Sequence, residues 1–296
     1  MVVFLAHGTG DPERLSQQNE RKNAMSELNR RNFLRNATLA SGAGLVASMT
    51  ASQQAAGQTA TDLKSLLTRD ELDYLRRFDT PTVANALERG KLPGIHGRSR
   101  LEGVMTPKIR CIFPELGIMN GYAATATIRA SRPRGQDEPY TSRTDYWKYI
   151  DSIPKPTIMV IHDLDAPNPV GSWWGEVHAN VHRALGCVGV ITDGGVRDLS
   201  VVRPLGFHFF AAEVLVSHAY VHVVDFGKPV SVGGVTVKSG DLLQGDEHGV
   251  IQVPSSVAKL VGQACYDVFK SERALIEFCQ TPGVTLEKMI EFVSNR

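Results

Sequence analysis

The sequence has few cysteines and no excess of either charge. Its four cysteines, Cys111, Cys187, Cys265 and Cys279, lie far apart and form no CxxC pair, which argues against a zinc knuckle or a thioredoxin-type redox pair. We expect mostly buried free thiols, with a disulfide still open for an exported protein. The 32 basic and 31 acidic residues nearly cancel, so no bulk positive field recruits nucleic acid or an anionic membrane.

What the chain does have is length and apolar content. Its 296 residues with 42% hydrophobic side chains are enough for one large globular domain with a buried core. Because the charges nearly cancel, small-molecule chemistry is the first expectation and binding to nucleic acid is not expected.

The first sixty residues have the pattern of a targeting segment. Arg30 and Arg31 precede a weakly apolar stretch at 37–47 that is rich in Gly and Ala, and this order resembles a twin-arginine export signal. Arg35 stands where such signals usually have Lys. The alternative is an ordinary amphipathic helix with a chance arginine pair. Translation from Met25 and cleavage somewhere in 47–60 are both compatible with the sequence.

This reading sets the expected domains and location. Residues 1–61 would be the leader, and 62–296 a single α/β domain without a stable membrane span after signal removal. The protein would be periplasmic, or cytoplasmic if the signal is not functional.

Hydrophobic patterning predicts alternating helices and strands. Two helices are expected within 62–89, the second capped by Thr80, and later helices at 140–149, 173–185, 199–205 and from 255 onward. Strands are expected at 104–105, 123–128, 157–162, 188–193 and 207–211, followed by short strands across 221–253. This order indicates an α/β fold.

One predicted strand runs into a polar turn. The stretch 188–193 leads into Gly194-Gly195-Val196-Arg197-Asp198, at the strand end where open α/β sheets bind ligands. The glycines would let the backbone approach a ligand. The planar guanidinium of Arg197 suits a carboxylate, and the hard oxygens of Asp198 suit Mg²⁺ or Mn²⁺. From composition alone, a plain surface ion pair in a turn is the favoured alternative.

Four motifs that occur in order along the chain favour a functional site at Arg197 and Asp198 over a surface ion pair. They are 174–176 (Trp-Gly-Glu), 194–198, 233–241 and 246–250, and Glu176 stands twenty intervening positions before Arg197. Over about 82–254 the chain resembles the RraA-like family, which includes 4-hydroxy-4-methyl-2-oxoglutarate aldolases with oxaloacetate decarboxylase activity, and regulators that bind a ribonuclease. The resemblance implies a layered α/β/β sandwich of the swivelling-domain type with helices at both ends.

The resemblance also assigns roles to residues. It implies that Arg197 binds a 2-oxo acid and that Asp198, with Glu176, holds a divalent metal, partly through water. It implies that a loop presents backbone N–H groups to the substrate, namely Gly175, Glu176, Val177 and His178. Asp246 or Glu247 would enter the site from a neighbouring subunit of a homotrimer or homohexamer. His178 replaces a usual apolar or amide residue, and Asn85 replaces a common Asp.

The implied reaction is that of a class II aldolase, a metal-dependent carbon–carbon lyase. The metal and Arg197 would stabilise the pyruvate enolate released from a 4-hydroxy-2-oxo acid or from oxaloacetate. A water on the metal, Glu176 or a neighbouring subunit's carboxylate could take the hydroxyl proton. Two alternatives stay open: a non-catalytic protein-binding regulator, and an exported lyase or hydrolase acting on another oxo acid through the same metal site.

Three other groups are interpreted as structural. Residues 162–165 (His-Asp-Leu-Asp) look like a metal cluster, but acidic residues after a strand more often form turns. His218 and His222 would lie on one side of a strand. Trp173 and Trp174 would pack in the core.

Overall fold

The computed structural model describes residues 66–89, 91–95, 99–136, 138 and 140–295. The expected leader, residues 1–61 with its arginine pair, lies outside these residues.

Two short helices begin the described part, as predicted: α3 (Arg69–Leu75) and α4 (Thr80–Arg89). Thr68 caps α3 through a capping box with Glu71. The expected cap of α4 by Thr80 is wrong. The carboxylate of Asp79 accepts the N–H of Thr82 at 2.9 Å instead, because the N–H and hydroxyl of Thr80 both bind the buried carboxylate of Asp246 at 2.7 Å.

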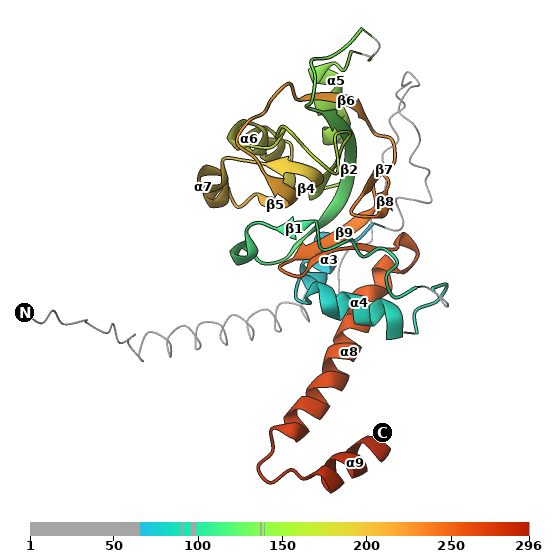
Figure 1. Ribbon diagram of the computed structural model, residues 1–296. Helices are drawn as coiled ribbons and strands as arrows, with labels where there is room; N and C mark the ends of the chain where they lie inside the picture. Colours follow the sequence, from blue (N-terminus) through green and yellow to red (C-terminus); the bar gives the residue numbers. More distant parts are fainter. Residues whose placement is uncertain (1–65, 90, 96–98, 137, 139, 296) are drawn as a thin grey trace, which may run out of the picture. The chain divides into compact units, whose positions relative to one another are not determined.

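The centre of the protein is an eight-stranded mixed sheet (Figure 1). Its four parallel strands are β2 (Met119–Arg129), β3 (Thr157–Asp163), β4 (Cys187–Val196) and β5 (His208–Val214). Their connections contain α5 (Arg143–Ser152), α6 (Glu176–Ala184) and α7 (Leu199–Val202). The carboxyl ends of these strands therefore meet at one edge, where the connecting loops gather.

Antiparallel strands extend the sheet on both sides. β1 (Arg110–Cys111) pairs with β5, and β9 (Leu242–Asp246) pairs with the first part of β2 and with β10 (Gly249–Val253). β6 (His222–Phe226) pairs with the last part of β2. The predicted strand at 104–105 is only an isolated bridge from Val104 to Ile251.

The two faces of the sheet bury different layers. Along β3, Met159 and Ile161 point into a core made with α3 to α8, whereas Ile158 and Val160 point into a second core. That second core is closed by the hairpin of β7 (Val230–Val232) and β8 (Val235–Val237). Helices, sheet and hairpin thus form the predicted α/β/β layers (Figure 1).

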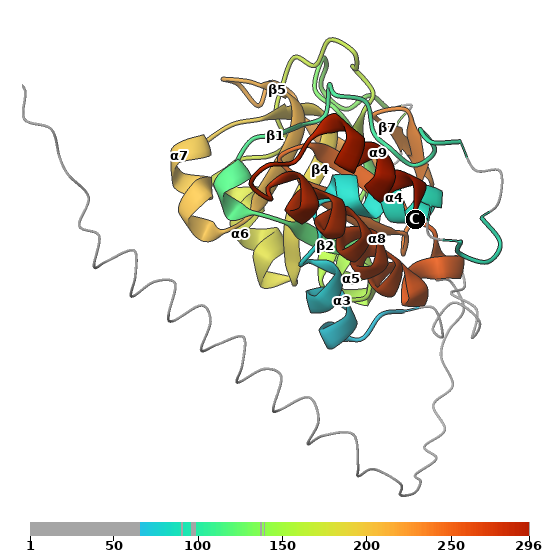
Figure 2. The same cartoon turned by 90° about the horizontal axis from the view of Figure 1, so that it is seen from below.

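The C-terminal part is helical, as predicted. α8 (Ala258–Cys279) packs against α3 and α4, and all its buried residues lie at or before Val268. α9 (Leu286–Ser294) follows α8 as the last helix of the described chain (Figures 1 and 2). The ring of Phe292 in α9 stacks on that of Phe278 in α8, with ring centroids 4.3 Å apart. No helix in the described part of the chain has both the length and the apolarity needed to cross a membrane.

The prediction of free thiols is confirmed, whereas burial holds for two of the four cysteines. All four are free thiols: Cys187 and Cys265 are buried, Cys111 is half-buried and Cys279 is exposed.

Candidate active site

The predicted turn after β4 begins later than expected. β4 continues through Gly194 and Gly195 to Val196. A Cβ on Gly194 would lie 2.8 Å from Oδ2 of Asp163, and one on Gly195 would lie 2.4 Å from the Leu215 side chain. Both glycines are therefore needed for packing against neighbours within the chain.

Asp198 holds a left-handed backbone conformation, with φ 59° and ψ 35°, where α7 begins. Asp and Asn tolerate this conformation better than most side chains do. The carbonyl of Asp198 accepts the N–H of Val202 at 3.0 Å, and its carboxylate Oδ2 accepts the N–H of Glu176 at 3.0 Å. The carboxylate thus points at the N-terminus of α6.

A second loop runs alongside the end of β4. Trp174 forms a parallel bridge with Val196, and the N–H of Arg197 donates to the carbonyl of Trp174 at 2.9 Å. The buried hydroxyl of Ser172 lies 2.7 Å from that carbonyl and 2.8 Å from the carbonyl of Gly195. Ser172 was not predicted from the sequence; a small polar residue in the run 171–175 was the only signal.

This pairing explains why α6 begins at Glu176 and not at the predicted Trp173. Trp174 is fully buried and extended against β4, so the helix can start only after Gly175. The predicted end is right: Gly186, with φ 81°, follows the last turn.

Gly175 is closely packed against Arg197 and Asp198. A Cβ at this position would lie 2.4 Å from Oδ2 of Asp198 and 3.2 Å from Nε of Arg197. Nε of Arg197 is 3.9 Å from Oδ2 of Asp198, and the two side chains are 34% and 36% exposed. The structure therefore brings Gly175, Glu176, Arg197 and Asp198 together at one accessible corner.

The first turn of α6 adds two of the predicted residues. Val177 is exposed, whereas His178 is half-buried and stacks on Trp173 with ring centroids 4.0 Å apart. Burial, reinforced by the positive charges of Arg143 and Arg197, lowers the pKa of His178 to about 4, so its ring is neutral at pH 7. Trp173 is half-buried and packs against the core beside His178, and Trp174 is fully buried in the core, as predicted for both.

Not all of the predicted backbone donors are available. The N–H of Glu176 is already bound to Asp198. Within the described residues, the N–H groups of Val177 and His178 have no partner, as is usual in the first turn of a helix. An anion at this corner can use those two.

Asp246 and Glu247 lie in different environments. Asp246 is 4% exposed, and its carboxylate is occupied by Thr80 and by the N–H of His248 at 2.9 Å. Asp246 is therefore engaged within its own chain. Glu247 is exposed, so a contribution from a neighbouring subunit stays a prediction for Glu247 alone.

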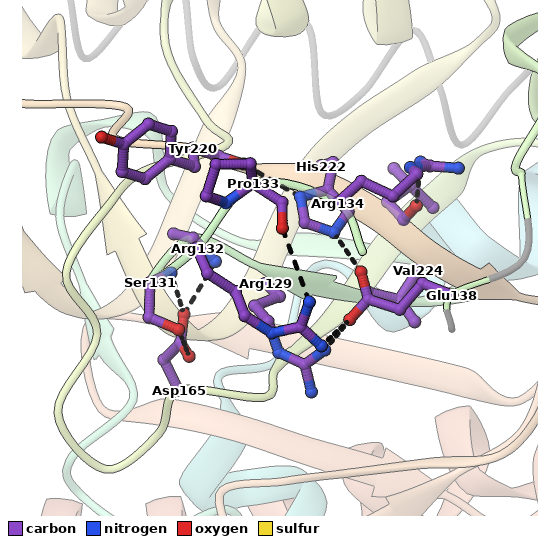
Figure 3. A network of polar contacts seen from close by, with 12 residues as sticks. Arg129, Ser131, Arg132, Pro133, Arg134, Glu138, Asp165, Tyr220, His222 and Val224 are labelled. Atoms are coloured by element: carbon purple, nitrogen blue, oxygen red, sulfur yellow. Dashed lines mark hydrogen bonds and ion pairs between the residues drawn. The ribbon is translucent and has the colours of Figure 1, made fainter. Parts of the chain in front are cut away.

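Asp163 ends β3 and Asp165 lies in the turn that follows, so these acidic residues form a turn, as interpreted. Oδ1 of Asp163 accepts the N–H of Asp165, whose own carboxylate accepts the N–H groups of Ala130 and Ser131 (Figure 3). His162 binds Asp193 at 2.7 Å. Of His218 and His222, which were expected in one strand, only His222 lies in a strand, β6. His218 precedes β6, and its Nδ1 lies 2.7 Å from the adjacent carbonyl of Ala219.

Asp163 gives a prediction about stability and pH. It is fully buried, and in the described part of the chain its Oδ2 has no hydrogen-bond partner. Burial, with repulsion from Asp165 and Asp193, raises its pKa to about 6. A raised carboxyl pKa costs stability as pH rises, here by about 2–3 kcal/mol between about pH 4 and pH 6. We expect Asp163→Asn to lose this dependence in denaturant titrations from pH 4 to 7.5.

The neighbouring Asp165 is a control for which the opposite change of stability with pH is expected. Although burial raises the pKa of Asp165, hydrogen bonds from Ser131 and Ala130 outweigh that effect and lower it. Asp165→Asn should therefore lose stability relative to the wild type as pH rises. Parallel pH profiles for the wild type and Asp163→Asn would contradict the assignment.

The described side chains at this corner can hold a divalent metal only if water and substrate supply the remaining ligands. Among the residues that the structure describes, no group of three or more His, Cys, Asp or Glu side chains could hold an ion. Mg²⁺, however, is commonly bound by one or two carboxylates plus waters and substrate oxygens. Asp198 is accessible, with only Oδ2 engaged by described residues, and Glu176 is exposed beside it. These two carboxylates match that pattern.

The fold is that of a known class of layered α/β/β proteins. The model of a family described as RraA-like (Aldolase/RraA) matches residues 80–252. The chain therefore belongs to the RraA-like family.

Individual relatives are distant. A Halalkalibacterium halodurans protein named "Putative 4-hydroxy-4-methyl-2-oxoglutarate aldolase" is 29% identical over 121 residues, which cover 39% of this chain and 58% of the relative. The chain thus matches just over half of that relative's length.

Two solved structures share the fold. An uncharacterised protein from Pseudomonas syringae pv. tomato has a TM-score of 0.59 and 22% identity, covering 76% of this chain and 95% of that one. Streptomyces coelicolor RraAS2, described as an unusual member of the RNase ES inhibitor RraA protein family, has a TM-score of 0.54 and 19% identity, covering 71% and 98%.

Proposed function

We propose that the protein is a divalent-metal-dependent lyase that cleaves a carbon–carbon bond of a 4-hydroxy-2-oxo acid to release pyruvate, and that also decarboxylates oxaloacetate. The observation that carries the proposal is the convergence of Arg197, Asp198 and the first turn of α6 around Gly175. The likeness to a protein named as an aldolase supports it.

The chain's own groups suit a 2-oxo acid. The guanidinium of Arg197 can bind the substrate carboxylate through two parallel hydrogen bonds. The N–H groups of Val177 and His178 point from a helix N-terminus, which favours negative charge on the adjacent carbonyl oxygen. Both interactions strengthen as that oxygen gains charge, so they favour the transition state over the bound substrate.

The proposed reaction is a retro-aldol cleavage. The 4-hydroxyl loses its proton and becomes a carbonyl, the bond between C3 and C4 breaks, and its electron pair stays on the pyruvate fragment as an enolate. A proton then returns to C3 to give pyruvate. Oxaloacetate loses carbon dioxide and leaves the same enolate.

Asp198 and Glu176 would hold Mg²⁺ or Mn²⁺, which when bound would supply Lewis-acid stabilisation of the enolate. With both carboxylates on the ion, Glu247 of a neighbouring subunit would be the candidate to take the 4-hydroxyl proton; if Asp198 alone holds the ion, Glu176 would be a second candidate. We further propose a homotrimer or homohexamer, which would bring Glu247 to the next subunit's site, and export to the periplasm by the twin-arginine route.

A substrate panel tests the proposal. Purified protein is mixed with Mg²⁺ or Mn²⁺ and with oxaloacetate or a series of 4-hydroxy-2-oxo acids, and pyruvate is measured with lactate dehydrogenase. We expect pyruvate release that stops in EDTA and returns with either metal. Undiminished release in the chelator, or none from any member of the panel, would refute the proposal.

A further inference from the structure

The last two helices extend beyond the layers of the domain. α8 packs on α3 and α4 through residues up to Val268 and then continues past them (Figure 1). None of residues 269–295, the C-terminal arm, is buried. The RraA-like family model ends at residue 252, so the arm lies outside the part of the chain that defines the family. The arm therefore needs an explanation of its own.

α9 carries an apolar stripe that points away from the rest of the described chain. Its side chains follow the i, i+3, i+4, i+7 spacing of one helical face, and each is at least 39% exposed: Leu286, Met289, Ile290 and Val293. A different face of α9 meets α8, through the stacked rings of Phe292 and Phe278. A helix of nine residues is marginal in water unless its apolar face is packed. The stripe is therefore expected to have a partner.

The end of α8 adds further apolar surface to the arm. Phe269, Leu275 and Ile276 are 36–46% exposed. With the stripe they leave roughly 600 Å² open on one arm, at the upper end of the largest apolar patch of an ordinary monomer. Two such arms packed together would bury on the order of 1,200 Å², which reaches the range of stable protein–protein interfaces.

The charges on α9 argue against a membrane as the partner. Helices that lie on anionic membranes carry Lys and Arg along their polar face. α9 instead carries Glu287 and Glu291 against one lysine, Lys288, whose ammonium group donates to the carbonyl of Gly283 at 3.0 Å. The surface that suits this helix is therefore apolar and basic.

The end of α8 offers such a surface. The guanidinium carbon of Arg273 lies 5.9 Å from the ring centre of Phe269, and Lys270 is exposed beside it in the sequence. The carboxylate of Glu272 is 3.5 Å from Arg89 of α4, so that negative charge is already paired. This part of α8 thus combines apolar side chains with positive charge.

The α9 helix of the same chain does not reach this surface. Phe292, close to the end of α9, is already level with Phe278, close to the end of α8. Phe269 lies nine residues earlier in α8, about 13 Å along the helix axis. Only three described residues follow Phe292, so the α9 that covers Phe269 must come from another molecule.

We infer that the C-terminal arm is a self-association surface, on which α9 of one copy packs against residues 269–276 of a second copy and receives the second α9 in return. The contact is made twice around a twofold axis, as in most homodimeric interfaces. Glu287 and Glu291 of each copy would face Lys270 and Arg273 of the other. No residue of the candidate active site takes part, so the pairing does not depend on the proposed function. It joins two single chains into a dimer, or two trimers into a hexamer.

The first test measures the mass of the full-length protein in solution by light scattering after gel filtration. We expect an even number of chains in the wild type. Ile290→Glu combined with Val293→Glu places two charges in the stripe and should halve the mass. Leu101→Glu is the matched control, because Leu101 is a 78% exposed leucine outside the arm, and it should leave the mass unchanged.

The second test separates pairing from misfolding of the arm. Glu287→Lys with Glu291→Lys makes both contact surfaces of a chain basic, and Lys270→Glu with Arg273→Glu makes both acidic. Each double variant alone should have half the wild-type mass, because like charges then face each other. An equal mixture of the two should recover the full mass, since every α9 then meets an α8 of opposite charge.

An odd number of chains in the wild type, an unchanged mass after the stripe substitutions, or no recovery in the mixture would overturn the pairing. Binding of an unpaired wild type to phosphatidylglycerol vesicles, lost in the stripe variant, would assign the stripe to a membrane and equally overturn it. If the masses behave as expected but the substrate panel yields no pyruvate, the pairing stands and the proposed function fails.

Discussion

Asp198→Asn is expected to reduce pyruvate release from oxaloacetate by about 100-fold or more, the order seen when a group that stabilises developing negative charge is lost. An asparagine oxygen can still accept the N–H of Glu176, which now binds Oδ2 at 3.0 Å. The variant therefore keeps the start of α6 but lacks the charge proposed to hold the metal. The rate is measured across a series of Mg²⁺ and Mn²⁺ concentrations, so that weakened metal binding is separated from a lower maximal rate.

Asp145→Asn is the control for this change. Asp145 is an exposed aspartate in the first turn of α5, and Lys148, at 3.5 Å, is the one described residue that forms an ion pair with it. Its replacement should leave the rate unchanged. Wild-type rates for Asp198→Asn would remove Asp198 from the mechanism.

Gly175→Ala is expected to lower the same activity by about 100-fold, because a displacement of about 1 Å in a catalytic group can cost that much. The added methyl would lie 2.4 Å from Oδ2 of Asp198 and 3.2 Å from Nε of Arg197, so both groups must move. The backbone at Gly175 is extended, with φ −160°, which alanine adopts readily. The effect should therefore appear in kcat and KM while the melting temperature stays near that of the wild type.

Gly262→Ala in α8 provides a matched glycine-to-alanine change. The nearest atoms to its added Cβ belong to the ring of Tyr74, at 3.0 Å, and α8 contributes nothing to the described site. It should retain wild-type activity. Full activity in Gly175→Ala would show that the close packing of Gly175 against Asp198 is irrelevant to catalysis.

Much of the sheet could be predicted because its signals are local. The strand predicted at 157–162 is an unbroken apolar run, as a parallel strand buried on both faces must be, and it is now β3. The same holds for 188–193 within β4. The neighbourhood of Glu176, Arg197 and Asp198 followed from the family resemblance, not from periodicity.

The features that could not be predicted depend on residues far apart in the sequence. Thr80 would be a good N-cap by its chemistry, but it binds Asp246, which is 166 residues away. Trp174 fits a helical pattern, yet its bridge to Val196 keeps it extended.

The most direct test is a crystal structure of the protein soaked with Mn²⁺ and oxalate, an unreactive mimic of the pyruvate enolate. We predict an anomalous manganese peak bonded to the carboxylate of Asp198, with oxalate bridging the ion and the guanidinium of Arg197. A well-ordered site with no manganese at Asp198, or with oxalate bound away from Arg197, would contradict the proposed mechanism.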